Sequence, residues 1–253
     1  MRPSRLRSFF AVAVATLFLV ACNQEGPIRQ QALSDSRAVS FTSQDGVRLA
    51  GRVFGPQHPQ SGVVLAHMFP ADQSSWFEFA DRLAGLGYAA LTFDFRGYCP
   101  GGSAGCSQGS KDISAIWQDV EGAARFLEQS TGLGSVTLVG ASMGGTAALI
   151  VAARSPQDVS TVVTLSAPEE FSGLVAGPEV LANVTASKLF IAGNGDGIAA
   201  QTAQTFFDES PQPKDLQIVT SSDHGTALLE GNQAEIVRNL IVGFLGQHAP
   251  AQV

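Results

Sequence analysis

The sequence carries little positive charge. Lysine and arginine total 15 residues against 22 acidic ones, which gives a net charge of −7 at pH 7. Chains that bind nucleic acid usually concentrate basic residues in one stretch or on one face. No basic stretch interleaved with aromatic residues occurs here. We therefore expect no nucleic-acid partner.

Cysteine is also scarce, with three residues in a chain of 253. Cys99 and Cys106 have no histidine or further cysteine nearby at the spacing of metal ligands, so we expect no metal site, and the sequence predicts no other cofactor. In an oxidising compartment two nearby cysteines usually pair. If the chain is exported, we expect a Cys99–Cys106 disulfide, with two free thiols as the alternative.

The apolar N-terminus is too short to span a bilayer. Phe9–Val20 is an uncharged run of 12 residues preceded by three arginines, which is typical of a signal-peptide core. The run ends in a Leu-Val-Ala-Cys tetrad that closes at Cys22. This tetrad resembles a bacterial lipobox, in which the cysteine is lipidated and becomes the mature N-terminus. An ordinary secretory signal cleaved near Ala21 and a retained membrane anchor are the alternatives.

The lipobox resemblance implies a location. A lipid on Cys22 would anchor the chain to a membrane of the bacterial cell envelope. Asn23 stands where an aspartate would favour retention in the inner membrane, so the outer membrane is favoured. We expect a lipoprotein signal peptide over residues 1–21, a flexible tether over 22–37 and one domain over 38–248. The oligomeric state is left open.

The remaining chain has an α/β pattern. Apolar residues alternate on both sides of Asp45-Gly46, which predicts a β-hairpin. Beyond it, apolar strand-like runs alternate with segments of helical periodicity, of which the clearest starts at Asp112 and the last covers residues 234–245. This alternation predicts an α/β fold: a mostly parallel sheet of about eight strands with helices on both faces. Active sites in such sheets lie at the carboxyl ends of the strands.

The most specific motif is Gly-x-Ser-x-Gly at residues 140–144. An apolar, β-branched run precedes it and a helix-like run of small residues follows. Glycines at both ends let the strand and the helix approach closely, and Ser142 can then project its hydroxyl from a strained turn. Here the chain resembles the α/β-hydrolase family, in particular its dienelactone-hydrolase and esterase-like members without a large cap. The resemblance covers about residues 38–245 and implies that Ser142 is a nucleophile; a glycine-rich turn that only packs tightly is the alternative.

A serine nucleophile needs a base and an acid. His224 comes after Ser142 in the chain and lies just beyond the last predicted strand, so we expect it to be the general base. Asp196 follows the preceding strand in a Gly-x-x-Asp pattern, and the resemblance implies that it orients His224. Glu169 and Glu170 are competing candidates for the acid. Asp223 is a weaker candidate because it is adjacent to His224.

The charge that develops on the substrate oxygen needs two N–H donors, which form an oxyanion hole. The resemblance places one donor at Met143 and the other in the turn after the strand over 62–66. There Phe69 is favoured and Met68 is the alternative. The family usually has His-Gly-x in this turn, whereas this chain has His67-Met68-Phe69. We interpret His67 as a structural residue that braces the loop.

Little room exists for a cap. Only about 20 residues separate the strand that ends near Ser166 from the strand that begins near Lys188, so we expect a minimal cap and an open site. The function that we expect is hydrolysis of carboxylic esters with a small to medium-sized acyl group, through an acyl-enzyme. A peptidase or thioesterase on the same residues, or a surface-tethered binding protein without activity, is the alternative. The candidate substrate-binding residues, each with core packing as its alternative, are Met68, Phe69, Trp76, Phe171 and Ile198.

Overall fold

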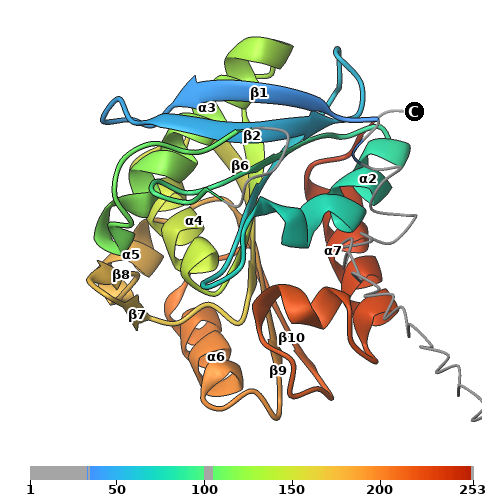
Figure 1. The fold of residues 1–253 in the computed structure, drawn as a ribbon. Helices are drawn as coiled ribbons and strands as arrows, with labels where there is room; N and C mark the ends of the chain where they lie inside the picture. Colours follow the sequence, from blue (N-terminus) through green and yellow to red (C-terminus); the bar gives the residue numbers. More distant parts are fainter. Residues whose placement is uncertain (1–32, 34, 100–104, 252–253) are drawn as a thin grey trace, which may run out of the picture.

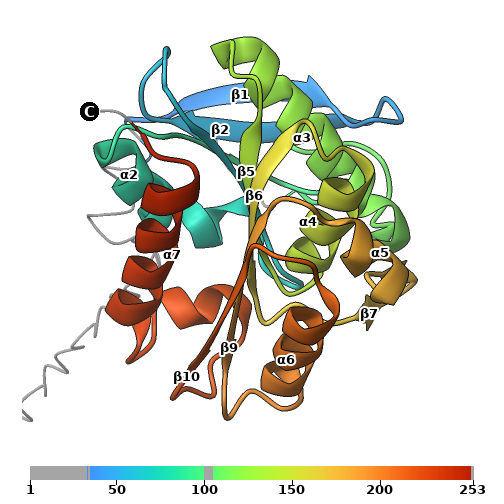
Figure 2. The same cartoon turned by 180° about the vertical axis from the view of Figure 1, so that it is seen from behind.

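A computed structural model describes residue 33, residues 35–99 and residues 105–251 of the chain. At its centre lies an eight-stranded sheet in the order β1-β2-β4-β3-β5-β6-β9-β10 (Figures 1 and 2). The expected signal peptide, the lipidation residue Cys22 and most of the expected tether lie outside the described residues. The sheet strands are β1 (Arg37–Thr42), β2 (Arg48–Phe54), β3 (Gly62–Ala66), β4 (Ala89–Phe93), β5 (Val136–Ala141), β6 (Val159–Leu165), β9 (Ser187–Gly193) and β10 (Lys214–Val219).

The sheet is mostly parallel, as the sequence predicts. Strand β2 runs antiparallel to β1 and to β4, and every other neighbouring pair is parallel. The β1–β2 hairpin turns at the expected Asp45-Gly46. Strands β3, β4 and β5 are buried at every position. Helices cover both faces of these central strands, which explains why they are continuous apolar runs rather than alternating ones.

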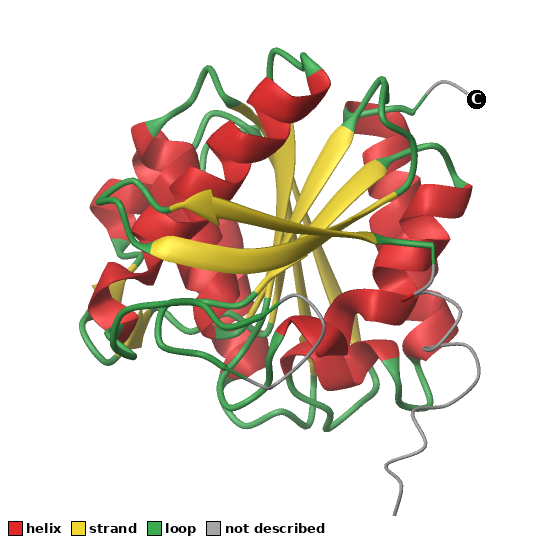
Figure 3. Cartoon of the chain, turned by 45° about the horizontal axis from the view of Figure 1, so that its top comes forward, coloured by secondary structure: helices red, strands yellow, loops and turns green. Residues whose placement is uncertain are grey.

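Helices cover the two faces in two groups (Figures 1 and 3). Helices α3 (Ile116–Thr131), α4 (Met143–Arg154), α5 (Pro178–Asn183) and α6 (Ala199–Glu209) pack on one face, and α2 (Phe77–Gly85) and α7 (Ala234–His248) on the other. The helix expected from Asp112 begins as a short 3-10 turn and continues as α3. The smaller elements are the 3-10 turns η1 (Gln73–Trp76), η2 (Ile113–Ala115) and η3 (Gly225–Leu229), and the hairpin of β7 (Glu170–Phe171) and β8 (Leu174–Val175).

A buried ion-pair network fixes the loop after β4. The Arg96 side chain is almost fully buried and donates to both carboxylate oxygens of Asp119, which is completely buried. Its two terminal nitrogens also donate to Asp45 at 2.7 and 2.9 Å, and these hydrogen bonds lower the pKa of Asp45 to about 2. Because every charge has a partner, the cost of burying them is offset. The network joins the β1–β2 turn, the loop after β4 and α3.

The end of the expected tether is attached to the domain. The Arg52 guanidinium donates to the Ser36 hydroxyl at 2.7 Å and to the Leu33 carbonyl at 3.1 Å. The side chain of Leu33 packs against the apolar cluster under α2 and α7. A side chain of β2 therefore binds two residues near the carboxyl end of the expected tether.

Cys99 and Cys106 form a disulfide with a Cα–Cα distance of 4.3 Å, as expected for an oxidising compartment. None of the helices in the described ranges has the length and apolar character needed to cross a bilayer.

Candidate active site

Ser142 occupies a sharp turn between β5 and α4. Its φ of 48° and ψ of −123° lie in a region that residues with a side chain rarely adopt, at a cost of about 1–3 kcal/mol. The Ser142 N–H donates to the Leu165 carbonyl at 2.8 Å, and its carbonyl accepts from the Gly145 N–H at 2.8 Å. The turn is therefore held from β6 on one side and from α4 on the other.

The two glycines of the motif are required by close packing. A Cβ on Gly140 would lie 2.3 Å from the Gly144 carbonyl oxygen, and a Cβ on Gly144 would lie 2.4 Å from the Ala66 carbonyl oxygen. Both distances are far below van der Waals contact, so neither position accepts a side chain without a backbone shift. This packing also brings the first turn of α4 against the loop that follows β3.

Asp196 and His224 form a direct pair. The Nδ1 atom of His224 lies 2.9 and 3.0 Å from the two carboxylate oxygens of Asp196. Since a carboxylate only accepts hydrogen bonds, Nδ1 carries the proton and Nε2 of the neutral ring is left as an acceptor. The His224 side chain is 45% exposed and that of Asp196 is 13% exposed. The arrangement can therefore hold an imidazole in the tautomer that a general base requires.

The loops that carry this pair are joined to each other and to the end of β5. The Gly195 N–H donates to the Ser221 carbonyl at 2.9 Å, which links the loop after β9 to the loop after β10. A Cβ on Gly225 would lie 2.6 Å from the Met68 sulfur and 3.4 Å from the Ala141 Cβ. The residue after His224 thus lies close to the residue before Ser142, with Met68 at the same junction. The sequence does not predict the contact between Met68 and Gly225; its one indication is that a glycine follows His224.

The competing carboxylates lie in other surroundings. Asp223 accepts a hydrogen bond from the Ser221 hydroxyl at 2.8 Å. Glu170 accepts from the Gly173 N–H at 2.9 Å within the β7–β8 hairpin, and Glu169 is exposed just before that hairpin. Within the described residues, Asp196 is the carboxylate in hydrogen-bond distance of His224. The same residues hold no group of three histidine, cysteine or acidic side chains placed to bind a metal ion.

His67 controls the orientation of the loop after β3. It is fully buried; its Nδ1 lies 2.9 Å from the Met68 carbonyl, and its Nε2 accepts from the Phe95 N–H at 3.2 Å. A carbonyl must accept and a backbone N–H must donate, so the ring is neutral with its proton on Nδ1. The Met68–Phe69 peptide is trans, so the Phe69 N–H points away from the carbonyl that His67 holds. These contacts agree with the interpretation of His67 as a residue that braces the loop.

Acid is expected to weaken the folded state through His67. Burial lowers the pKa of this ring from 6.5 to about 4, so the unfolded chain takes up the proton first as the pH falls. The stability that the neutral ring provides is complete above pH ~6.5 and is lost toward pH ~4. Glutamine keeps a donor and an acceptor but does not titrate. Between pH 7 and 4.5, denaturant unfolding should show wild type losing about 2 kcal/mol relative to His67→Gln.

The matched control for this prediction is His58→Gln, because His58 is exposed. Its unfolding free energy should follow that of the wild type at each pH. Parallel curves for wild type and His67→Gln would contradict a buried neutral imidazole at position 67.

The candidate substrate-binding residues fall into different environments. Trp76 is completely buried and its ring packs against Phe79 in the core under α2, which matches the core-packing alternative. Phe69 and Ile198 are exposed, by 49% and 74%, whereas Met68 and Phe171 are half-buried. The sequence pattern could not separate these cases, because an aromatic residue in a helix-like segment can face the core or the site.

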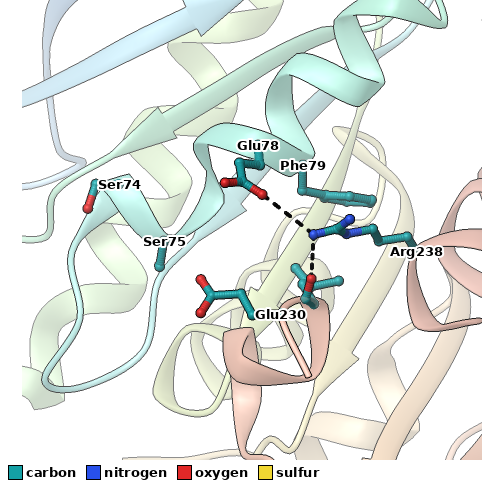
Figure 4. Close-up of a pocket in the computed structure, with 7 residues that line it drawn as sticks. Ser74, Ser75, Glu78, Phe79, Glu230 and Arg238 are labelled. Carbon is teal, nitrogen blue, oxygen red and sulfur yellow. Dashed lines mark hydrogen bonds and ion pairs between the residues drawn. The ribbon is translucent and has the colours of Figure 1, made fainter. Parts of the chain in front are cut away.

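A small recess lies between α2, η3 and α7, and none of its lining residues belongs to the motif at Ser142 (Figure 4). Arg238 of α7 reaches across it. Its guanidinium donates to the Leu229 carbonyl and lies 3.7 Å from the Glu78 carboxylate. Arg238 therefore ties η3, the segment that follows His224, to α2 and α7. The recess is lined by Ser74, Ser75, Glu78, Phe79, Leu229, Glu230 and Arg238.

Comparisons with known proteins agree with this architecture. The model of the alpha/beta hydrolase fold family matches residues 63–234. Uncharacterized proteins from two strains of Mycobacterium tuberculosis are each 31% identical to this chain over 226 residues, which is 81% of this chain and 78% of each relative.

Solved structures of the same fold include enzymes that cleave esters. Dienelactone hydrolase from Anabaena variabilis has a TM-score of 0.68 at 21% identity, over 85% of this chain and 99% of that one. An esterase from Pyrococcus furiosus has a TM-score of 0.71 at 17% identity, over 87% of this chain and 93% of that one. At these identities the likeness shows the fold alone. The family model and the relatives settle the classification: this chain belongs to the alpha/beta hydrolase fold family.

Proposed function

We propose that this protein is a serine hydrolase that cleaves carboxylic esters, with Ser142 as nucleophile, His224 as general base and Asp196 as the acid that orients His224. The observation that carries the proposal is the hydrogen bond of 2.9 Å between His224 and Asp196, together with the packing of Gly225, the residue after His224, near Ala141 at the end of β5. Support also comes from the strained backbone of Ser142 and from the esterases among the structures of similar fold.

The proposed reaction has two acyl transfers. His224 Nε2 takes the proton of Ser142 as the hydroxyl oxygen attacks the ester carbonyl carbon. The N–H groups of Met143 and Phe69 stabilise the oxyanion of the tetrahedral intermediate. Its collapse breaks the bond to the alcohol oxygen, which leaves with the proton from His224. Water, deprotonated by the same ring, then attacks the acyl-enzyme and releases the acid, and Ser142 regains its proton. Asp196 stabilises the imidazolium in both halves.

Covalent labelling tests the assignment without a mutation. The protein lacking the residues before Asn23 is incubated with a fluorophosphonate probe, and the modified residue is located by peptide mass spectrometry. We expect one label, on Ser142, and loss of p-nitrophenyl butyrate hydrolysis in step with labelling. A protein that hydrolyses no ester, thioester or amide in a substrate panel and takes up no label would contradict the proposal and favour a binding protein on this fold.

We also infer that the chain is a lipoprotein of the bacterial cell envelope, anchored through Cys22 and with the outer membrane favoured. The support is the N-terminal sequence together with the Cys99–Cys106 disulfide, which fits an oxidising compartment. Replacing Cys22 with alanine removes the lipidated thiol. In cell fractionation, the variant should move to the soluble fraction or stay unprocessed at its larger mass.

The controls for the anchor are Ala21→Ser, which keeps the thiol and a small residue before it, and labelling with an alkyne fatty acid. Ala21→Ser should remain membrane-bound and labelled. If Cys22→Ala stays in the membrane at the mature mass, the lipoprotein assignment is wrong.

A further inference from the structure

Apolar side chains are exposed around the proposed catalytic residues. Phe69 lies in the loop after β3 and Ile198 two residues beyond Asp196, and these large hydrophobic residues are exposed by 49% and 74%. Contiguous exposed apolar surface often marks a binding site. Phe69 and Ile198 give the loops at the proposed site an exposed apolar surface.

Two phenylalanines from different elements meet on this surface. The ring centroids of Phe69 and Phe171 are 6.3 Å apart, with the ring planes at 41°, which is within the range of an aromatic pair. Phe69 belongs to the loop whose N–H is the proposed oxyanion donor. Phe171 belongs to β7. Their contact bridges the loop after β3 and the β7–β8 hairpin.

The hairpin that carries Phe171 is firmly held. The Thr146 hydroxyl of α4 donates to the Pro168 carbonyl at 2.6 Å, just before the hairpin. The Ala176 N–H donates to the Glu169 carbonyl at 2.8 Å and closes the hairpin, and Leu174 is buried in the core beside α4. The hairpin has little conformational freedom left to lose, so an apolar group can bind over the paired rings without first ordering the hairpin.

The position of Phe171 indicates which part of the ester it would contact. The β7–β8 hairpin packs against α4, whereas η3, which follows His224, packs against α7 on the opposite face of the sheet (Figure 1). The alcohol oxygen must leave from the side of His224, because that ring protonates it. The acyl group stays on Ser142 and extends away from His224, toward the hairpin.

We propose that Phe69 and Phe171 form the acyl-binding surface and that the substrates are esters of medium-length or aromatic apolar acids rather than acetate esters. This inference rests on the proposed esterase function. Full burial of one methylene group would strengthen binding about fourfold. An open surface covers about half of each methylene group, so each group would strengthen binding about twofold. From acetyl to hexanoyl, kcat/KM should therefore rise about tenfold or more.

The test compares p-nitrophenyl acetate, butyrate and hexanoate, which share one leaving group. Phe171→Ala should lower the ratio of kcat/KM for hexanoate over acetate about fivefold, mainly through KM, because the apolar surface is lost for both ground state and transition state. Phe171→Leu should restore most of the ratio. Ile236→Ala is the matched control: Ile236 is 54% exposed on α7, and its removal should leave the ratio unchanged.

Two results would overturn the acyl assignment while leaving the esterase proposal intact. One is Ser142-dependent activity whose hexanoate-to-acetate ratio is the same in wild type and Phe171→Ala. The other is a series of alkyl acetates in which Phe171→Ala removes a preference for long alcohols, because the surface would then bind the leaving group. Absence of any Ser142-dependent hydrolysis would instead contradict the proposed function itself.

Discussion

Replacing Ser142 with alanine is expected to lower kcat for p-nitrophenyl butyrate by about 10⁴- to 10⁶-fold, because it removes the atom that forms the acyl-enzyme. The remaining rate would come from bound water and the oxyanion donors. Fluorophosphonate labelling should disappear with the activity. Initial rates on purified protein, compared with the rate in buffer, measure the effect.

Stability provides a second readout for the same position. Ser142 holds φ at 48°, which alanine also resists but glycine accepts freely. Ser142→Gly should therefore be inactive and yet more stable than Ser142→Ala by about 1 kcal/mol in denaturant unfolding. A loss of activity together with a gain in stability is expected when backbone strain is stored at a functional site.

Ser172→Ala is the matched control, because Ser172 also has a positive φ, of 51°, in the turn of the β7–β8 hairpin. It should keep full activity and react with the probe. A Ser142→Ala protein that retains more than a tenth of the wild-type rate would contradict the assignment of the nucleophile.

Much of the fold could be predicted because its signals are local. The hairpin at Asp45-Gly46 and the buried runs of the parallel strands each follow from a short window of residues. The candidates Ser142, Asp196 and His224 follow from the resemblance to the α/β-hydrolase family, and each lies just beyond a predicted strand, where strand ends gather at one edge of a parallel sheet. The hydrogen bond between Asp196 and His224 agrees with that expectation. The chemical role of these residues stays a prediction.

Contacts between distant segments could not be predicted. Trp76 has helical spacing with its neighbours, but which way its ring points depends on α2 packing against the sheet. The Arg96 network joins three segments whose charges are unremarkable in the sequence. The contact of Met68 with Gly225 depends on how the loops after β3 and β10 meet. Each of these is set by packing rather than by local pattern.

Replacing Asp196 with asparagine is expected to lower kcat by about 10³- to 10⁴-fold with little change in KM. The amide NH₂ would donate to Nδ1 of His224, so the ring proton would move to Nε2. A protonated Nε2 can no longer accept the proton of Ser142. The 45% exposure of the imidazole lets water reorient some rings, so the loss should fall short of that for Ser142→Ala. Steady-state kinetics between pH 6 and 9 measure it.

Glu169→Gln and Glu170→Gln are the matched controls, since each removes one carboxylate on the β7–β8 side of the site. Both should retain kcat within about twofold, because neither carboxylate contacts His224 and the Glu170 bond to Gly173 can be kept by the amide oxygen. If Glu170→Gln or Glu169→Gln lost activity while Asp196→Asn kept it, the acid would lie at or just before the β7–β8 hairpin. The pair at His224 and Asp196 would then be structural, and the imidazole would have to rotate away from Asp196 during turnover.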